Sequence, residues 1–174
     1  MNNHQLDVYY FKWNDIGDIA LGRPNLGPTT LVAVYRLMQY TMKDVLNINY
    51  GPEKSQELFY EAGLLAGKEF CKNMLNTHLP LNEFIAQLHD ILLKLTIGVL
   101  KIEKFDPEHL NFTLTISEDL DCSGLPITGN TVCDYDEGFI AGILETYSGK
   151  KFYVKEIDCW STGDRTCRFI ANPI

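Results

Sequence analysis

Four of the five cysteines in this 174-residue chain fall between Cys122 and Cys167, and this clustering limits how the C-terminal third can fold. An odd number of cysteines fits poorly with a complete disulfide framework. The N-terminus carries no basic region followed by an apolar run and a cleavage site, so we expect a cytoplasmic protein whose thiols stay reduced. Reduced cysteines gathered in one region point either to a metal site or to small buried core residues.

The segment from Cys159 to Cys167 is predicted to form a β-hairpin in which the two cysteines face each other. Gly163 lies midway between them, where a tight loop needs a residue that adopts positive φ. In that register the two Cβ atoms lie about 4.5–5.5 Å apart on one face of the sheet. Two thiolates so placed can share one tetrahedral metal ion.

Cys133 is expected to reach the same site from a helix. Thr131 and Asp134 fit the Ser/Thr-x-x-acid pattern of a helix start, with Thr131 as the N-cap. Cys133 then lies in the first turn, where the helix dipole lowers the pKa of a thiol and favours the thiolate that a metal requires. Three thiolates from two elements predict a zinc site.

The residues alone leave the fourth ligand open among Glu156, Asp158 and Cys122. In a regular strand Glu156 and Cys159 point to opposite faces, so a role for Glu156 requires a bend or β-bulge. Cys122 has no such constraint, but it lies in a loop (residues 120–130) whose path the sequence does not indicate.

Hydrophobic periodicity predicts a single α+β domain over residues 1–174. Helices are expected from Thr29 or Thr30 to about Leu46, from Pro52, from Leu81 to about Leu95, and from about Val132 to Tyr147. Strands are expected in the opening segment (6–21) and at 99–105, 110–116, 152–159 and 166–171. We expect the N-terminal helices to pack on an antiparallel sheet, with the C-terminal helix and hairpin tied by zinc.

Several function classes are disfavoured. A formal charge of −8 and the lack of a basic stripe argue against direct nucleic-acid binding. The longest apolar stretch, Ile91 to Leu100, is interrupted by Lys94 and is too short to span a bilayer. The chain shows no G-x-S-x-G elbow, H-E-x-x-H motif or phosphate-binding loop, so we name no catalytic residue. These observations favour a binding module over an enzyme.

The C-terminal pattern resembles the signature of the 4-vinyl-reductase domain family. The resemblance covers residues 132–169 and consists of a Cys, a helix with G-x-x-x-G, a strand ending in Glu-x-x-Cys, a Gly-Asp pair and a last Cys. These signature residues are Cys133, Gly138, Gly142, Glu156, Cys159, Gly163, Asp164 and Cys167.

The resemblance implies a ligand set, a fold and a function. In the family's aromatic-hydrocarbon sensors one zinc is held by Cys, Glu, Cys and Cys, and these roles fall here on Cys133, Glu156, Cys159 and Cys167, which leaves Cys122 out. The family fold is shared with small vesicle-tethering (TRAPP) subunits and commonly forms homodimers. Members sense phenols and related hydrocarbons upstream of transcription-activation domains, or are linked to reduction of a vinyl group in bacteriochlorophyll synthesis.

We therefore expect a sensor module that binds a small hydrophobic or aromatic molecule and has no output domain of its own. Four protein ligands leave zinc no open position, so we expect a structural zinc. Two alternatives stay open: a component of a reductase acting on a vinyl-type group, and a dimeric scaffold. The sequence does not identify the ligand-binding residues. Candidates are the aromatic residues Trp13, Tyr35, Tyr40, Phe59, Tyr60, Phe70 and Phe84, together with His89, whose imidazole could bond a phenol-like hydroxyl.

Overall fold

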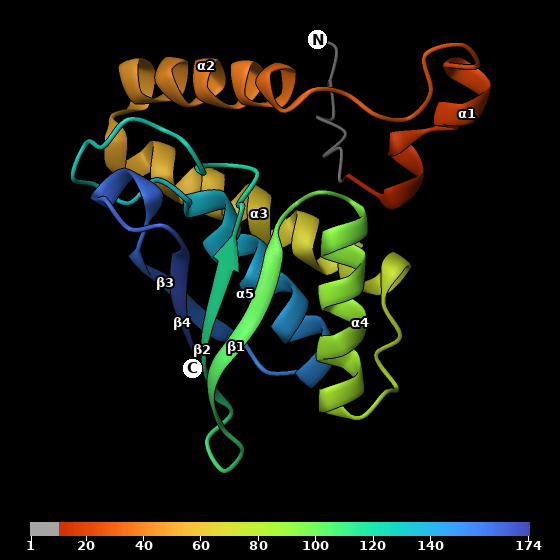
Figure 1. Cartoon of the computed structure of the whole chain (residues 1–174), viewed down its shortest axis with the longest axis vertical. Helices are drawn as coiled ribbons and strands as arrows, with labels where there is room; N and C mark the ends of the chain where they lie inside the picture. Colours follow the sequence, from red (N-terminus) through yellow and green to blue (C-terminus); the bar gives the residue numbers. More distant parts are fainter. Residues whose placement is uncertain (1–10) are drawn as a thin grey trace, which may run out of the picture.

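A computed structural model describes residues 11–174, which form helices on one antiparallel sheet (Figure 1). The four strands lie in the spatial order β1-β2-β4-β3, and every neighbouring pair is antiparallel. The strands are β1 (Val99–Asp106), β2 (Asn111–Ser117), β3 (Phe152–Asp158) and β4 (Cys167–Pro173). The main helices are α2 (Val32–Tyr50), α3 (Pro52–Met74), α4 (Leu81–Lys94) and α5 (Asp134–Ser148). The predicted α+β class and antiparallel sheet are confirmed.

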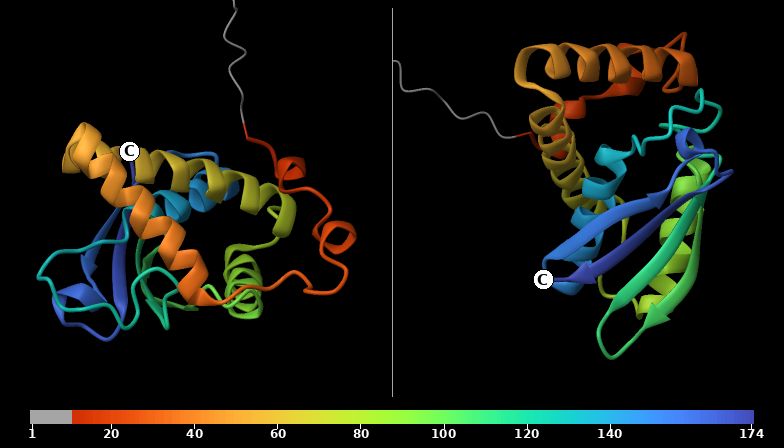
Figure 2. Two further views of the ribbon diagram at one scale, coloured as in Figure 1. Left: turned by 90° about the horizontal axis from the view of Figure 1, so that it is seen from above. Right: turned by 90° about the vertical axis from the view of Figure 1, so that its left-hand side faces the viewer.

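The helices form successive layers over one face of the sheet (Figures 1 and 2). Helix α5 packs against β3 and against α3, which lies behind it, while α4 packs against β1. Helix α2 contacts α3 and lies farther from the sheet. The predicted alternation in β2 is confirmed, because Phe112, Leu114 and Ile116 are buried in the core below these helices.

Helices α3 and α5 approach each other at backbone distance. A Cβ atom on Gly63 or Gly67 of α3 would collide with the backbone of Tyr135 or Phe139 in α5. Gly138 and Gly142 of α5 contact the backbone of α3 in the same way. The close approach predicted for the α3 glycines is therefore confirmed, and its partner is the second pair of glycines, because only residues without a Cβ leave room for two helix backbones in direct contact.

The strand predicted in the opening segment is wrong for the residues that the structure describes. Residues 6–10 lie outside the described residues, and the chain then forms a 3-10 turn, η1 (Trp13–Ile16), and a short helix, α1 (Ile19–Gly22). Asp15 accepts a hydrogen bond from the Lys12 N–H, and Asp18 accepts one from the Leu21 N–H. Asp side chains that bond nearby backbone amides favour turns and helix starts over strands.

Two predicted helix starts are displaced by two residues. Helix α2 begins at Val32, after Leu31 rather than after a threonine cap, and continues to Tyr50. Helix α5 begins at Asp134 with Cys133 as its N-cap residue, so Thr131 is not the cap. Cys133 therefore lies just before the first turn, and its carbonyl accepts the Glu137 N–H.

Candidate metal centre and apolar cavity

Four cysteine sulfurs meet beside the end of the sheet. The Sγ atoms of Cys122, Cys133, Cys159 and Cys167 all lie within 4.8 Å of one another, and all four residues are buried. Cys133 Sγ is 3.9 Å from Cys159 Sγ and 3.9 Å from Cys167 Sγ, and Cys122 Sγ is 2.9 Å from Cys167 Sγ. Tetrahedral zinc with Zn–S bonds of about 2.3 Å separates its sulfur ligands by about 3.8 Å. The donor set and most of its spacing therefore fit a thiolate-bound metal.

A β-bulge turns Glu156 and Cys159 to the same side of β3. The pairing of β3 with β4 shifts register between Glu156 and Asp158. Glu156 and Cys159 are both buried, whereas Ile157 between them is exposed. The irregularity that a role for Glu156 requires is thus present.

The link between Cys159 and Cys167 is a longer loop than a simple hairpin. The pairing of β3 with β4 ends at Asp158 and Arg168, one step before the two cysteines. A 3-10 turn, η2 (Trp160–Thr162), follows, and Gly163 then has a φ of +107°. The positive φ predicted for this glycine is confirmed, and the loop returns the chain so that both thiols enter the cluster.

Glu156 lies next to the sulfur cluster. Its Oε2 atom accepts a hydrogen bond of 3.2 Å from the backbone N–H of Cys133, and its Oε1 atom has no hydrogen-bond partner within residues 11–174. Burial and the neighbouring Cys159 thiol raise the pKa of this carboxyl to about 8. A buried carboxyl oxygen without a partner is costly, and a bound cation would satisfy it.

Cys122 enters the cluster from a loop that α2 holds in place. Asp119 Oδ1 accepts hydrogen bonds from the N–H groups of Asp121 and Cys122, at 2.8 Å and 2.9 Å. Tyr35 of α2 donates to Asp121 Oδ1 at 2.8 Å, and Arg36 donates to the Leu120 carbonyl at 2.7 Å. No periodic pattern or cap signature marks this loop, so sequence reasoning did not place Cys122.

Hydrogen bonding among the thiols separates their pKa values. Bonds from Cys122, Cys133 and Cys167 lower the pKa of the Cys159 thiol. Bonds to the other thiols raise the pKa of Cys133 and of Cys167. The first thiolate therefore forms on Cys159, and the remaining thiols lose their protons more readily when a cation is present to stabilise the negative charge.

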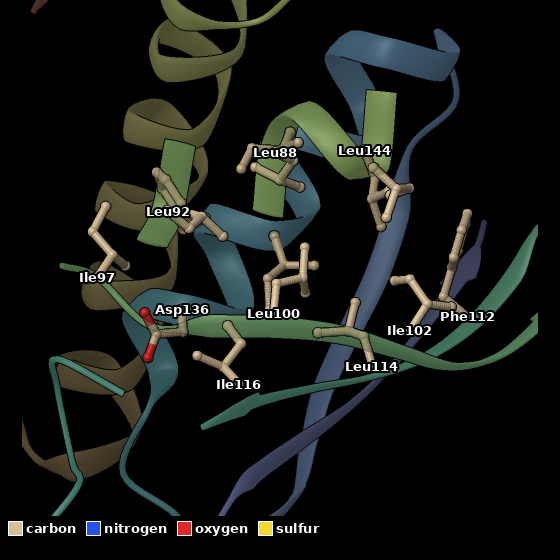
Figure 3. Close-up of a pocket in the computed structure, with 14 residues that line it drawn as sticks. Leu88, Leu92, Ile97, Leu100, Ile102, Phe112, Leu114, Ile116, Asp136 and Leu144 are labelled. Atoms are coloured by element: carbon tan, nitrogen blue, oxygen red, sulfur yellow. The ribbon is translucent and has the colours of Figure 1, made fainter. Parts of the chain in front are cut away.

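A small apolar cavity lies between α4, α5 and the sheet (Figure 3). Its volume is about 30 Å³. Thirteen apolar residues and Asp136 line it: Ile85, Leu88, Leu92, Ile97, Leu100, Ile102, Phe112, Leu114, Ile116, Asp136, Phe139, Ile140, Ile143 and Leu144. A site of this kind suits the apolar body of a small molecule.

The aromatic residues that the sequence suggested as pocket walls lie elsewhere. None of the seven lines this cavity, although Tyr35 and Phe59 line a separate hollow of about 260 Å³ between α2 and α3. His89 does not line the cavity either, because its Nδ1 atom lies 2.8 Å from the Leu100 carbonyl oxygen and ties α4 to β1. The walls are branched aliphatic side chains, which pattern reasoning cannot distinguish from ordinary core.

Comparison with known proteins places the cluster in a family. Residues 112–173 match the family model of the 4-vinyl-reductase domain, and this range contains the four clustered cysteines and Glu156. An uncharacterised protein of Methanocaldococcus jannaschii is 27% identical over 83% of this chain and 78% of its own length. A second from the same organism is 27% identical over 60% of this chain, which spans only 59% of that relative.

Solved structures share the fold. The phenol-responsive sensory domain of the transcription activator PoxR, solved with phenol, has a TM-score of 0.61 at 15% identity, covering 84% of this chain and 76% of that domain. A vinyl-4-reductase family protein from M. jannaschii has a TM-score of 0.63 at 19% identity, covering 96% and 98% of the two chains. Subunit 3 of the trafficking protein particle complex from Naegleria fowleri, covalently bound to palmitic acid, has a TM-score of 0.64 at 9% identity, covering 82% and 95%.

Within residues 11–174 we find no helix with the length and apolar character needed to cross a membrane. The sulfur cluster, the C-terminal part of the sheet and helix α5 all fall inside the matched range. The C-terminal part of this chain is a 4-vinyl-reductase domain.

Proposed function

We propose that this chain is a small-molecule sensor module in which the cavity between α4, α5 and the sheet takes a small hydrophobic or aromatic ligand. The observation that carries the proposal is the cavity itself, because its lining is apolar except for one carboxyl group. The fold likeness to a sensory domain solved with phenol supports it. So does the likeness to a subunit that holds palmitic acid.

The cavity must widen to admit a ligand. A volume of about 30 Å³ has room for about one water molecule, whereas a benzene ring needs a cavity of about 150 Å³. Helix α4 is the wall that can move, because it packs on the edge strand β1 while α5 is locked against α3 by the glycine contacts. Displacement of α4 by a ligand would convert binding into a change of shape, which is what a sensor transmits.

Methyl NMR tests the proposal on the full chain, with phenol as the probe. Six isoleucines line the cavity, whereas Ile157 and Ile174 are exposed at a distance from it and serve as internal controls. Saturable shifts of the cavity methyl groups, with the two control methyl groups unchanged, are expected on addition of phenol. Shifts confined to methyl groups outside the cavity, or no saturable shift, would remove the proposal. The six cavity isoleucines are Ile85, Ile97, Ile102, Ile116, Ile140 and Ile143.

We further propose that zinc ties the start of α5 to the ends of β3 and β4. Cys133, Cys159 and Cys167 belong to both possible ligand sets, and the fourth ligand is Glu156 by resemblance or Cys122 by sulfur position. Four protein ligands would leave the metal without an open position, so its contribution is structural. All five cysteines are free thiols, which supports a reducing, cytoplasmic compartment.

The fourth ligand can be assigned by comparing two variants. Because Cys122 Sγ already lies among the other sulfurs, we expect Cys122→Ser to weaken zinc affinity by about 10- to 100-fold, and Glu156→Gln to weaken it less. Competition with a chromogenic chelator measures both affinities. The opposite order would assign the fourth position to Glu156.

Helix α2 supports the proposal that the protein forms a homodimer. Its inner side is polar, where Tyr35, Gln39 and Lys43 bond Asp121 and Asp134. Its outer side is apolar and exposed, with Leu37 66% and Ile48 76% exposed. An exposed apolar stripe on a helix is typical of an interaction surface, and a second copy of the same stripe would cover it symmetrically. The exposed apolar residues of this helix are Val32, Val34, Leu37, Met38, Met42, Val45, Ile48 and Tyr50.

Charges placed on α2 should separate the dimer. The double substitution Leu37→Glu and Ile48→Glu is expected to shift sedimentation from dimer to monomer while the thermal melting temperature of the fold changes little, since both side chains are exposed. Leu21→Glu, at a residue equally exposed but outside α2, is the control and should remain dimeric. A monomeric wild-type protein would contradict the proposed interface.

A further inference from the structure

Asp136 is the one polar side chain in the lining of the apolar cavity. It lies in the first turn of α5 and is only 7% exposed. Its Oδ2 atom has no hydrogen-bond partner among the described residues. Figure 3 shows the Asp136 carboxyl at one end of the lining, beside Ile97 and Ile116. A buried carboxyl group without a partner needs one, and the cavity is the space where a partner can be placed.

The charge around the cavity limits which ligand groups can meet Asp136. Within residues 11–174, no Lys, Arg or His side chain lines the cavity. The groups whose charges act on Asp136 are acidic or thiol groups, including Asp119, Asp121 and Glu156. A ligand carboxylate would therefore meet negative groups with no compensating cation. A neutral hydroxyl, in contrast, can donate a hydrogen bond to a carboxyl oxygen whether or not that carboxyl carries a proton on its other oxygen.

We propose that Asp136 determines ligand specificity by accepting a hydrogen bond from the ligand's single polar group. This inference rests on the proposed function and deepens it. The ligand class is a small uncharged molecule with an apolar body and one hydroxyl, an alcohol or a phenol, and long-chain carboxylates are rejected. The aliphatic walls set the shape of the body, and Asp136 sets the orientation of the hydroxyl.

Phenol, toluene and benzoate form a matched set of probes. They share the ring and differ only in the group that Asp136 would meet: a donor, a methyl or a carboxylate. We expect the wild-type full chain to bind phenol at least about tenfold more tightly than toluene, because toluene leaves the buried carboxyl unpaired. Benzoate is expected to bind more weakly than either. Dissociation constants come from titrations of the cavity isoleucine methyl groups.

Two variants connect the preference to Asp136 itself. Asp136→Leu should abolish the preference for phenol over toluene, whereas Asp136→Asn retains a carbonyl oxygen and should retain part of it. The zinc content of each variant is measured alongside, because Asp136 lies within 4.8 Å of potential ligand atoms of Cys133 and Asp119. Loss of zinc in Asp136→Leu would assign the residue to the metal site instead and overturn the proposal.

The outcomes separate this inference from the proposed function. Binding of phenol and toluene with equal affinity to the wild-type chain would overturn the role of Asp136 and leave the sensor proposal standing, with a bound water serving the carboxyl. Absence of cavity binding by both probes would overturn the proposed function. The wild-type comparison decides even if Asp136→Leu does not fold.

Discussion

Substitution of Cys159 by serine is expected to reduce zinc content from near one ion per chain to near zero. Cys159 is fully buried, its sulfur lies among three others, and its thiol has the lowest pKa of the cluster. Without it, the start of α5 and the ends of β3 and β4 lose their common ligand. We expect the free energy of unfolding to fall by at least about 3 kcal/mol, because metal binding to such sites contributes directly to folding. For a chain of this length that corresponds to a fall of about 6–12 °C in the melting temperature.

The matched control is Cys71→Ser. Cys71 is equally buried but lies in α3 and is not part of the cluster. This variant should keep its zinc and lose only about 1–3 kcal/mol for burying a hydroxyl group. Metal analysis by mass spectrometry and thermal melting measure both effects. Wild-type protein that is folded but binds no metal would contradict the zinc proposal and leave the cysteines as core residues.

Substitution of Gly67 by alanine is expected to destabilise the fold by at least about 2 kcal/mol, or about 4–8 °C in the melting temperature. Alanine normally stabilises a helix relative to glycine by about 1 kcal/mol, so propensity alone predicts the opposite sign. The added methyl group would collide with the backbone of Phe139, and a backbone cannot turn aside as a flexible side chain can.

Gly22→Ala is the control for this prediction. No atom lies within 4 Å of a Cβ built at Gly22, and its φ is not positive. Its effect should stay within about 0.5 kcal/mol. A Gly67→Ala variant as stable as the wild type would mean that α3 and α5 do not pack as closely as the structure has them.

The sequence predicted those features that local patterns determine. Alternating residues located β2, and a change of period separated the helices from the strands. The need for a bulge at Glu156 followed from strand parity, and the structure has it. The α3 glycines indicated a close contact but not the partner, because which helix face meets which is decided by tertiary packing.

Other features of the site depend on long-range contacts that no local pattern records. Cys122 is positioned by Asp119 within its own loop and by side chains of α2 about 80 residues away in sequence. The cavity is formed by aliphatic residues that each resemble ordinary core. The N-terminal error arose because aromatic residues near Trp13 outweighed Asp15 and Asp18, whose side chains cap local turns.

A crystal structure of the full chain grown with phenol tests the central claim most directly. The account predicts electron density for one ring in a widened cavity between α4, α5 and the sheet, with α4 displaced from β1 and the hydroxyl directed at Asp136. Density in the hollow between α2 and α3, or a cavity that stays closed at saturating phenol, would contradict it.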